Sequence, residues 1–243
     1  MSTPWTVRRA TSPHALPLPA MPPLSERYRV AWLTRSGEIE ECERAGPATP
    51  FFLHSFSALA RGALLRTPEG IVAIEDAHPG MKIVTTRGTR TLRWIGSCTI
   101  RPDREGRTLY RLPADAMGLG RPAPDLMLGP GARLVTLVEG CHAERARARA
   151  LVPVADLVDG QSVLAIRPLS AIACYQLGFA EHETLDVNGM EVESLHPETA
   201  MAGANDALRR LYMSMFPHKA GVEDFGPPAL HRIAAPSTYG PSV

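Results

Sequence analysis

Only a few places in this sequence bring a nucleophilic side chain close to a side chain that can carry a proton. Ser55 and Ser57 closely follow His54, and Cys141 stands directly before His142. A hydroxyl or thiol beside an imidazole can attack acyl groups, because the imidazole takes up the proton of the nucleophile. Neighbouring residues on a strand or helix point apart, however, and Cys141 lies in a charged stretch. We therefore interpret the Cys141-His142 pair as chance adjacency and the serines as ordinary residues at the start of a strand.

Metal-binding patterns in the sequence are weak. The four cysteines are widely spaced and form no Cys-x-x-Cys pair: Cys42, Cys98, Cys141 and Cys174. This spacing does not favour a structural zinc site, and we expect reduced, mostly buried thiols. Glu181-His182-Glu183 places two carboxylates around one imidazole, but a single histidine is a weak metal signal, so we expect packing or hydrogen bonding there. We predict neither a metal nor a cofactor.

The charge balance excludes some classes of partner. The chain has 26 lysines and arginines against 25 aspartates and glutamates, a net charge of +1. A dedicated nucleic-acid binder carries a clear basic excess, so we predict no nucleic-acid partner. No apolar run is long enough for a membrane span, and residues 1–24 lack the apolar core of a secretory signal. The expected location is the cytoplasm by default, and export without a cleaved signal peptide stays open.

Proline and glycine divide the chain into segments. Residues 1–24 contain six prolines, which favour a flexible tail. Residues 25–49 predict a peripheral hairpin followed by a linker, and residues 50–200 predict one all-β domain of short strands separated by turns. Residues 201–217 contain a predicted helix. Residues 218–243 again contain several prolines, and we expect a second flexible tail there.

Two local signals in this arrangement are strong. Glu181–Leu195 predicts a hairpin, because Asn188-Gly189 supplies the residue types that a two-residue turn requires. Asn205–Phe216 predicts a helix that ends at Pro217, because apolar residues recur there at helical spacing. The apolar face of this helix consists of Ala207, Leu208, Leu211, Tyr212 and Met215.

Three separated blocks resemble the Hedgehog/intein (Hint) domain family, in the order found there. The first is Ser57–Gly96, which closes on Arg-Trp-Ile-Gly. The second is Leu128–Leu134 (LGPGARL), and the third is Gly178–Ser194 around His182-Glu183, which is most similar to the bacterial Hint group. The resemblance covers roughly residues 50–200. It implies the Hint fold, an all-β horseshoe of short strands and hairpins, here with one C-terminal helix packed against it.

The resemblance also implies a chemistry. In this family a cysteine or serine attacks the preceding peptide carbonyl and a histidine transfers protons, an acyl shift. The nucleophile position falls on Ala58 and the histidine position on Ala132, so neither position carries a reactive group. Gly62-Ala63 stands where the family has Gly-Thr, and Met81 stands where it has aspartate. The His-Asn pair that intein splicing needs occurs nowhere in the sequence.

Two functions are compatible with these observations. The alanines favour a Hint domain that has lost self-processing and acts as a binding or structural module for an unidentified protein partner, with the Pro-rich ends as candidate partner-binding segments. The alternative is a self-cleaving, intein-like domain that uses a displaced nucleophile, Ser57 or Cys141. Ser57 is disfavoured, because a shift of one residue along a strand turns the side chain to the opposite face.

Overall fold

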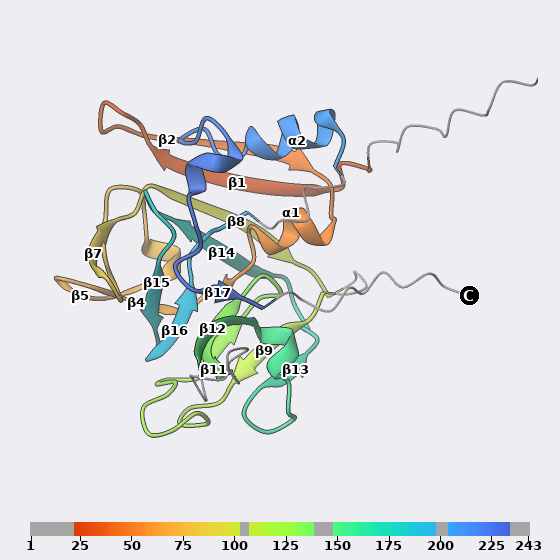
Figure 1. Ribbon diagram of the computed structural model, residues 1–243. Helices are drawn as coiled ribbons and strands as arrows, with labels where there is room; N and C mark the ends of the chain where they lie inside the picture. Colours follow the sequence, from red (N-terminus) through yellow and green to blue (C-terminus); the bar gives the residue numbers. More distant parts are fainter. Residues whose placement is uncertain (1–21, 103–106, 139–147, 198–203, 234–243) are drawn as a thin grey trace, which may run out of the picture.

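The computed structural model describes residues 22–102, 107–138, 148–197 and 204–233. Across these ranges the chain forms short strands and two α-helices, arranged in two sheets (Figure 1). The all-β prediction is confirmed. The reason lies in the glycines and prolines, which interrupt the chain every few residues and leave strands of two to eight residues between turns.

The first sheet is antiparallel throughout and joins segments from almost the whole described chain. Its strands, in spatial order, are β13 (Leu164–Ile166), β9 (Leu109–Leu112), β10 (Leu126–Leu128), β3 (Leu59–Ala60), β14 (Ile172–Gly178), β8 (Trp94–Ile100), β1 (Glu26–Leu33) and β2 (Ile39–Gly46). The central pairing of β14 with β8 runs in register over seven residues, from Ile172 opposite Ile100 to Gly178 opposite Trp94.

The second sheet contains the shorter hairpins. Its main path is β17 (His231–Arg232), β12 (Ala148–Pro153), β11 (Arg133–Val138), β16 (Met190–Glu193), β15 (Thr184–Val187), β4 (Leu64–Thr67) and β5 (Gly70–Ala73). A side branch adds β6 (Lys82–Thr85), which pairs with β15, and β7 (Gly88–Thr91). Strands β17 and β12 are parallel, and the other pairs are antiparallel.

Two apolar clusters hold these layers together. The first combines both sheets and includes Leu65, Leu128 and Leu134. The second covers the other face of the first sheet, where α1 (Pro50–His54) and α2 (Asp206–Met213) bring aromatic rings onto β1 and β8. Side chains alternate between faces along a strand, so β8 buries Trp94 in the second cluster and turns Ile95 toward the first.

The strong local predictions are confirmed. Strands β15 and β16 form the expected hairpin, with Asn188 and Gly189 at φ values of 52° and 81°, in the left-handed region that glycine and asparagine tolerate best. Helix α2 begins after Asn205, whose side chain accepts a hydrogen bond from the Leu208 amide at 2.8 Å. Of the predicted apolar face, Tyr212 and Met215 are buried and Leu208 and Leu211 are half-buried, but Ala207 is exposed.

The segment before the domain differs from its description as a peripheral hairpin and linker. Strands β1 and β2 do form a hairpin, but Tyr28 and Val30 are fully buried, because β1 also pairs with β8 inside the first sheet. Helix α1 lies at the start of the predicted all-β domain, directly after the predicted linker, where short strands were expected. Helices α1 and α2 lie at the end of the hairpin remote from its turn (Figure 1).

The segment from residue 218 also differs from the flexible tail expected there. Residues 218–233 run back over the fold and end in β17 beside β12. Phe225 is buried against Phe216, and the Ile233 amide donates to the Leu151 carbonyl oxygen at 2.9 Å. The prolines of this segment interrupt regular structure without preventing packing. The rest of the two predicted flexible tails, residues 1–21 and 234–243, lies outside the described residues.

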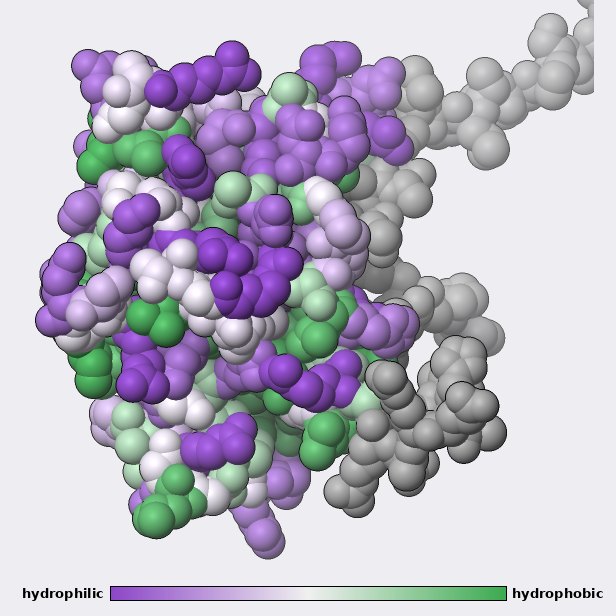
Figure 2. Space-filling model, turned by 60° about the vertical axis from the view of Figure 1, so that its left-hand side comes forward, coloured by the Kyte–Doolittle hydropathy of each residue, from purple (hydrophilic) through white to green (hydrophobic). Residues whose placement is uncertain are grey.

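The surface mixes residue types. Hydrophilic and hydrophobic residues alternate at short range over the face shown in Figure 2, and the most exposed apolar side chains, Leu119 and Leu169, belong to loops. In the part of the chain that the structure describes, no helix is long and apolar enough to cross a membrane.

Candidate functional site

A glycine-containing loop, residues 129–131, donates hydrogen bonds to the backbone around the Ser57–Ala58 peptide bond, far away in the sequence. The Gly131 amide donates to the Ser57 carbonyl oxygen at 3.0 Å, and the Gly129 amide donates to the Ala58 carbonyl oxygen at 2.9 Å. No larger residue fits at either glycine. A Cβ atom on Gly129 would overlap the Ser57 carbonyl, and a Cβ atom on Gly131 would overlap the carbonyl of His54. The first two blocks found in the sequence therefore meet at one peptide bond.

The two positions that the resemblance marks as reactive lie in apolar surroundings. Ala58 is fully buried and Ala132 is 1% exposed, and both belong to the cluster that joins the sheets. Ala132 follows the glycine loop directly, and its amide donates to the Gly129 carbonyl oxygen. A methyl group can neither attack the Ser57 carbonyl nor transfer a proton to the leaving amide. The arrangement therefore holds an amide between two buried methyl groups.

The hydroxyl of Ser57 is committed elsewhere. The side chain is fully buried, and its Oγ donates to the Leu53 carbonyl oxygen at 2.6 Å, back toward α1. Ser55 likewise contacts the Phe51 carbonyl and shares a hydrogen bond with the Tyr212 hydroxyl. These bonds give both serines structural roles at the end of α1. Cys141, the other alternative nucleophile, and His142 lie outside the described residues.

A buried ionic cluster lies next to this peptide, and the sequence did not reveal it. Its centre is Glu193, whose side chain is only 3% exposed. Arg232 Nε approaches Glu193 Oε1 at 2.8 Å, and Arg133 Nε lies 3.7 Å from Oε2. His54, Gly131 and Glu193 line the same small cavity, which places the cluster beside the glycine loop.

His182, which lies in the loop just before β15, completes this cluster. Its Nε2 lies 3.2 Å from Glu193 Oε1, and its Nδ1 accepts a hydrogen bond from the Ala229 amide at 2.8 Å. An acceptor at Nδ1 needs a lone pair, which places the proton of the neutral ring on Nε2, facing Glu193. The Nε2 to Glu193 contact meets a distance criterion for an ion pair, but its angles do not make a well-formed hydrogen bond.

The environment of Glu193 favours its charged form. Burial acts to raise the pKa of this carboxyl, but the His182 contact and the charges of Arg232 and Arg133 outweigh burial and hold the pKa below its usual value. A second histidine, His196, packs against His182 with ring centroids 4.9 Å apart, and burial lowers its pKa. Glu193 is therefore an anchored carboxylate, held by fixed positive groups.

Glu183, beside His182, points into a separate set of contacts. Its fully buried carboxylate accepts from Arg87 Nη2 at 2.9 Å, from Arg90 Nε at 3.1 Å and from the Thr85 hydroxyl at 3.1 Å. The two neighbours thus serve two different networks, both of them hydrogen-bonding. Among the described residues, no three histidine, cysteine, aspartate or glutamate side chains are grouped to hold a metal ion.

The spacing of these residues explains why the sequence could not reveal the cluster. Arg133, Glu193 and Arg232 are separated by about 40 to 60 residues and come from β11, β16 and β17. The available signal was the pattern His-Glu followed by Glu-Ser in the third block, which marked His182 and Glu193 without showing their partners. The buried thiols were expected, and Cys98 and Cys174 are buried and free.

The chain is therefore an all-β domain of two sheets, in which a glycine loop binds the backbone at the internal Ser57–Ala58 peptide bond. Residues 57–199 match the family described as the Hint domain, and this match spans more than half of the chain. The chain therefore belongs to the Hint domain family, as the three blocks predicted.

Among solved structures, a crystal structure of the gp41-1 intein is similar to this chain at 9% sequence identity with a TM-score of 0.35. The likeness covers 57% of this chain and 99% of the intein chain, and at such distance it says nothing about activity. A comparison with curated proteins finds no match.

Proposed function

We propose that this chain is a Hint domain that has lost self-processing and acts as a binding or structural module. The observation that carries the proposal is the combination of a peptide bond bound by the glycine loop with two methyl groups at Ala58 and Ala132. The backbone amides that would orient a peptide for an acyl shift are in place, whereas the nucleophile and the proton carrier are not.

The chain keeps a stable arrangement around the former reaction centre. Glu193 is neutralised by Arg133 and Arg232 and contacts His182, so the buried polar groups are used to fix strands to one another. Such a cluster supports a rigid domain whose surfaces and ends are available to partners.

Intact mass measurement tests the loss of activity. The full-length chain is incubated with hydroxylamine or a thiol, either of which releases a fragment from any ester or thioester formed in the backbone. We expect the mass to stay that of the intact chain. A discrete fragment that disappears in Ser57→Ala or Cys141→Ala would overturn the proposal and favour the self-cleaving alternative.

A gain-of-function variant supplies the positive control. Ala58→Cys together with Ala132→His returns a thiol and an imidazole to the two positions, beside a carbonyl that Gly131 already binds. If the loss of these groups alone silenced the chain, hydroxylamine releases a fragment cut between residues 57 and 58. Each single variant is the matched control, since neither restores both functions.

The binding role is tested by removing chain ends. The structure shows that residues 218–233 belong to the folded domain, so the ends to remove are residues 1–21 and 234–243. Partners captured by the full-length chain should be lost from one truncated form while its melting temperature is kept. If both truncated forms keep the partners, the binding surface lies on the β domain; if the full-length chain captures none, the binding role is contradicted.

A further inference from the structure

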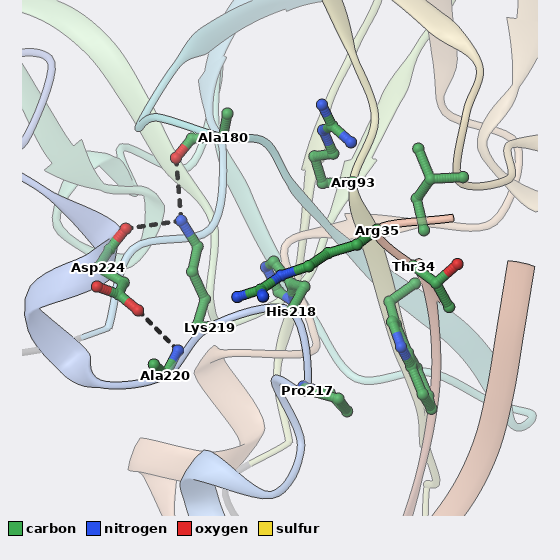
Figure 3. Close-up of a pocket in the computed structure, with 11 residues that line it drawn as sticks. Thr34, Arg35, Arg93, Ala180, Pro217, His218, Lys219, Ala220 and Asp224 are labelled. Atoms are coloured by element: carbon green, nitrogen blue, oxygen red, sulfur yellow. Dashed lines mark hydrogen bonds between the residues drawn. The ribbon is translucent and has the colours of Figure 1, made fainter. Parts of the chain in front are cut away.

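A cavity of about 670 Å³, whose lining includes neither Ser57 nor Ala58, opens at the surface of the domain (Figure 3). One wall comes from the end of β1 and the turn after it, at Trp32 and Arg35, and another from Arg93 before β8. The segment that follows α2 closes it with His218 and Lys219. Its volume lies in the range of sites for small organic ligands.

Positive groups dominate the lining. Arg35 and Arg93 are exposed, and their guanidinium groups have no ion-pair or hydrogen-bond partner among the described residues. Lys219 is fixed by two backbone carbonyls, with Nζ donating to Ala180 at 2.9 Å and to Asp224 at 2.7 Å, which leaves one ammonium hydrogen over (Figure 3). In the view of Figure 3, Arg35 extends from the hairpin past His218 toward Lys219.

The negative group of the cavity is already occupied. The Asp224 carboxylate accepts from the amides of Ala220 at 2.7 Å and Gly221 at 3.3 Å, which holds it against its own turn. Three cations therefore face one carboxylate that is turned to backbone donors. The cavity keeps a positive excess that no described side chain neutralises.

His218 adds a second, independent sign of an absent partner. Both ring nitrogens are buried, and neither has a hydrogen-bond partner within the described part of the chain. The ring stacks on Trp94 with centroids 6.2 Å apart. Burial, with the charges of Lys219 and Arg93, lowers the pKa of His218 to about 4, so the ring is neutral and has one N–H to donate. A buried donor without an acceptor is costly unless a ligand supplies one.

We propose that this cavity binds a small organic oxyanion, carrying a phosphate or several carboxylates, held by Arg35, Arg93 and Lys219. Guanidinium groups bind both kinds of oxyanion through paired N–H donors, so phosphate and carboxylate share the recognition chemistry. The half-buried Trp32 offers a flat surface for the body of such a ligand. The inference does not rest on the loss of self-processing, so either proposal can fail alone.

Isothermal titration calorimetry on the full-length chain tests the site. Pyrophosphate and citrate serve as probes, each in a buffer free of other phosphates and carboxylates, with sodium chloride at matched ionic strength as the blank. We expect saturable binding of at least one probe, weakening as salt rises. Binding of pyrophosphate alone assigns a phosphate ligand, and binding of citrate alone assigns a carboxylate ligand.

The variants Arg35→Gln and Arg93→Gln locate the binding. Each removes one exposed cation and should weaken the probe by about tenfold, the usual worth of a charge-assisted contact. The matched control is Arg29→Gln, an exposed arginine on the same hairpin that does not line the cavity. Saturable binding that all three variants share equally, or no saturable binding of either probe, would overturn the proposal.

Discussion

Single side chains decide both the chemistry and the stability of this domain. Around the Ser57–Ala58 peptide bond the decisive residues are small: Ala58 and Ala132 are buried, and the amides of Gly129 and Gly131 bind the carbonyls of Ala58 and Ser57. Next to these residues, the buried carboxylate of Glu193 lies close to Arg133 and Arg232. Removal of a buried charge such as that of Glu193 would leave the charges of its partners uncompensated.

We expect Glu193→Gln to destabilise the protein by about 3 kcal/mol, because Arg133 and Arg232 would keep their buried charges without the carboxylate that neutralises them. Urea unfolding followed by circular dichroism measures the change. The control is Glu191→Gln, two residues away on β16, whose half-exposed pair with Arg149 should be worth less than about 1 kcal/mol. Equal losses in the two variants would contradict the central role of Glu193.

His218 should make stability depend on mildly acidic pH. The pKa of this ring is about 4 in the folded protein, below its ordinary value of 6.5. Between these values the unfolded chain binds more protons than the folded one, so the free energy of unfolding falls as the pH drops from 6.5 toward 4. The ring is partly exposed, and we expect its contribution to be about 1–3 kcal/mol.

The measurement is the free energy of unfolding at several pH values in buffers free of phosphate and citrate. His218→Gln should flatten the fall between pH 6.5 and 4, and His78→Gln, at an exposed position, is the matched control. An unchanged slope in His218→Gln would mean that other groups carry the acid sensitivity, with His196 the next candidate because burial also lowers its pKa.

At the scale of elements, the sequence predicted those structures that depend on residues near one another in the chain. The β15–β16 hairpin followed from Asn188-Gly189, and α2 followed from its apolar spacing before Pro217. Helix α1 was missed, because five residues that begin with a proline carry too short a pattern. Which strands pair could not be predicted, because those contacts, such as β3 with β14, join residues more than a hundred positions apart.

The cap of α2 gives a test at this scale. Asn205→Ala removes the acceptor for the Leu208 amide and should cost about 1 kcal/mol of stability. Asn205→Asp keeps an acceptor at the same place and should recover most of that loss. Thermal unfolding of the three proteins measures both effects, and equal destabilisation by alanine and aspartate would show that the cap is not what stabilises this end of the helix.

Across the whole molecule, the segment after α2 joins parts that the domain would otherwise leave separate. Phe225 packs beside the aromatic cluster, Lys219 reaches the Ala180 carbonyl, and Arg232 closes the Glu193 cluster. Its sequence, rich in proline and glycine, predicted none of this, because each anchor is a single residue and a single residue makes no periodic pattern.

Deletion of residues 218–243 should therefore lower the melting temperature by at least ~5 °C, through the loss of Phe225 burial and of an arginine from the Glu193 cluster. Differential scanning calorimetry makes the comparison. A chain ending at residue 233 keeps every contact described for this segment and should melt with the full-length protein. If the longer deletion also melts unchanged, the segment rests on the domain without stabilising it.

The hydrogen bonds that the glycine loop donates beside the Ser57–Ala58 peptide bond make local opening of this part of the fold measurable. The amide hydrogens of Gly131 and Gly129 are bound to the carbonyl oxygens of Ser57 and Ala58, so they exchange with solvent only when the glycine loop separates from the segment that leads into β3. Their exchange rates therefore report how often this centre opens in the intact molecule. Slow exchange at both glycines, on the scale of global unfolding, would mark this centre as one of the most persistent parts of the fold.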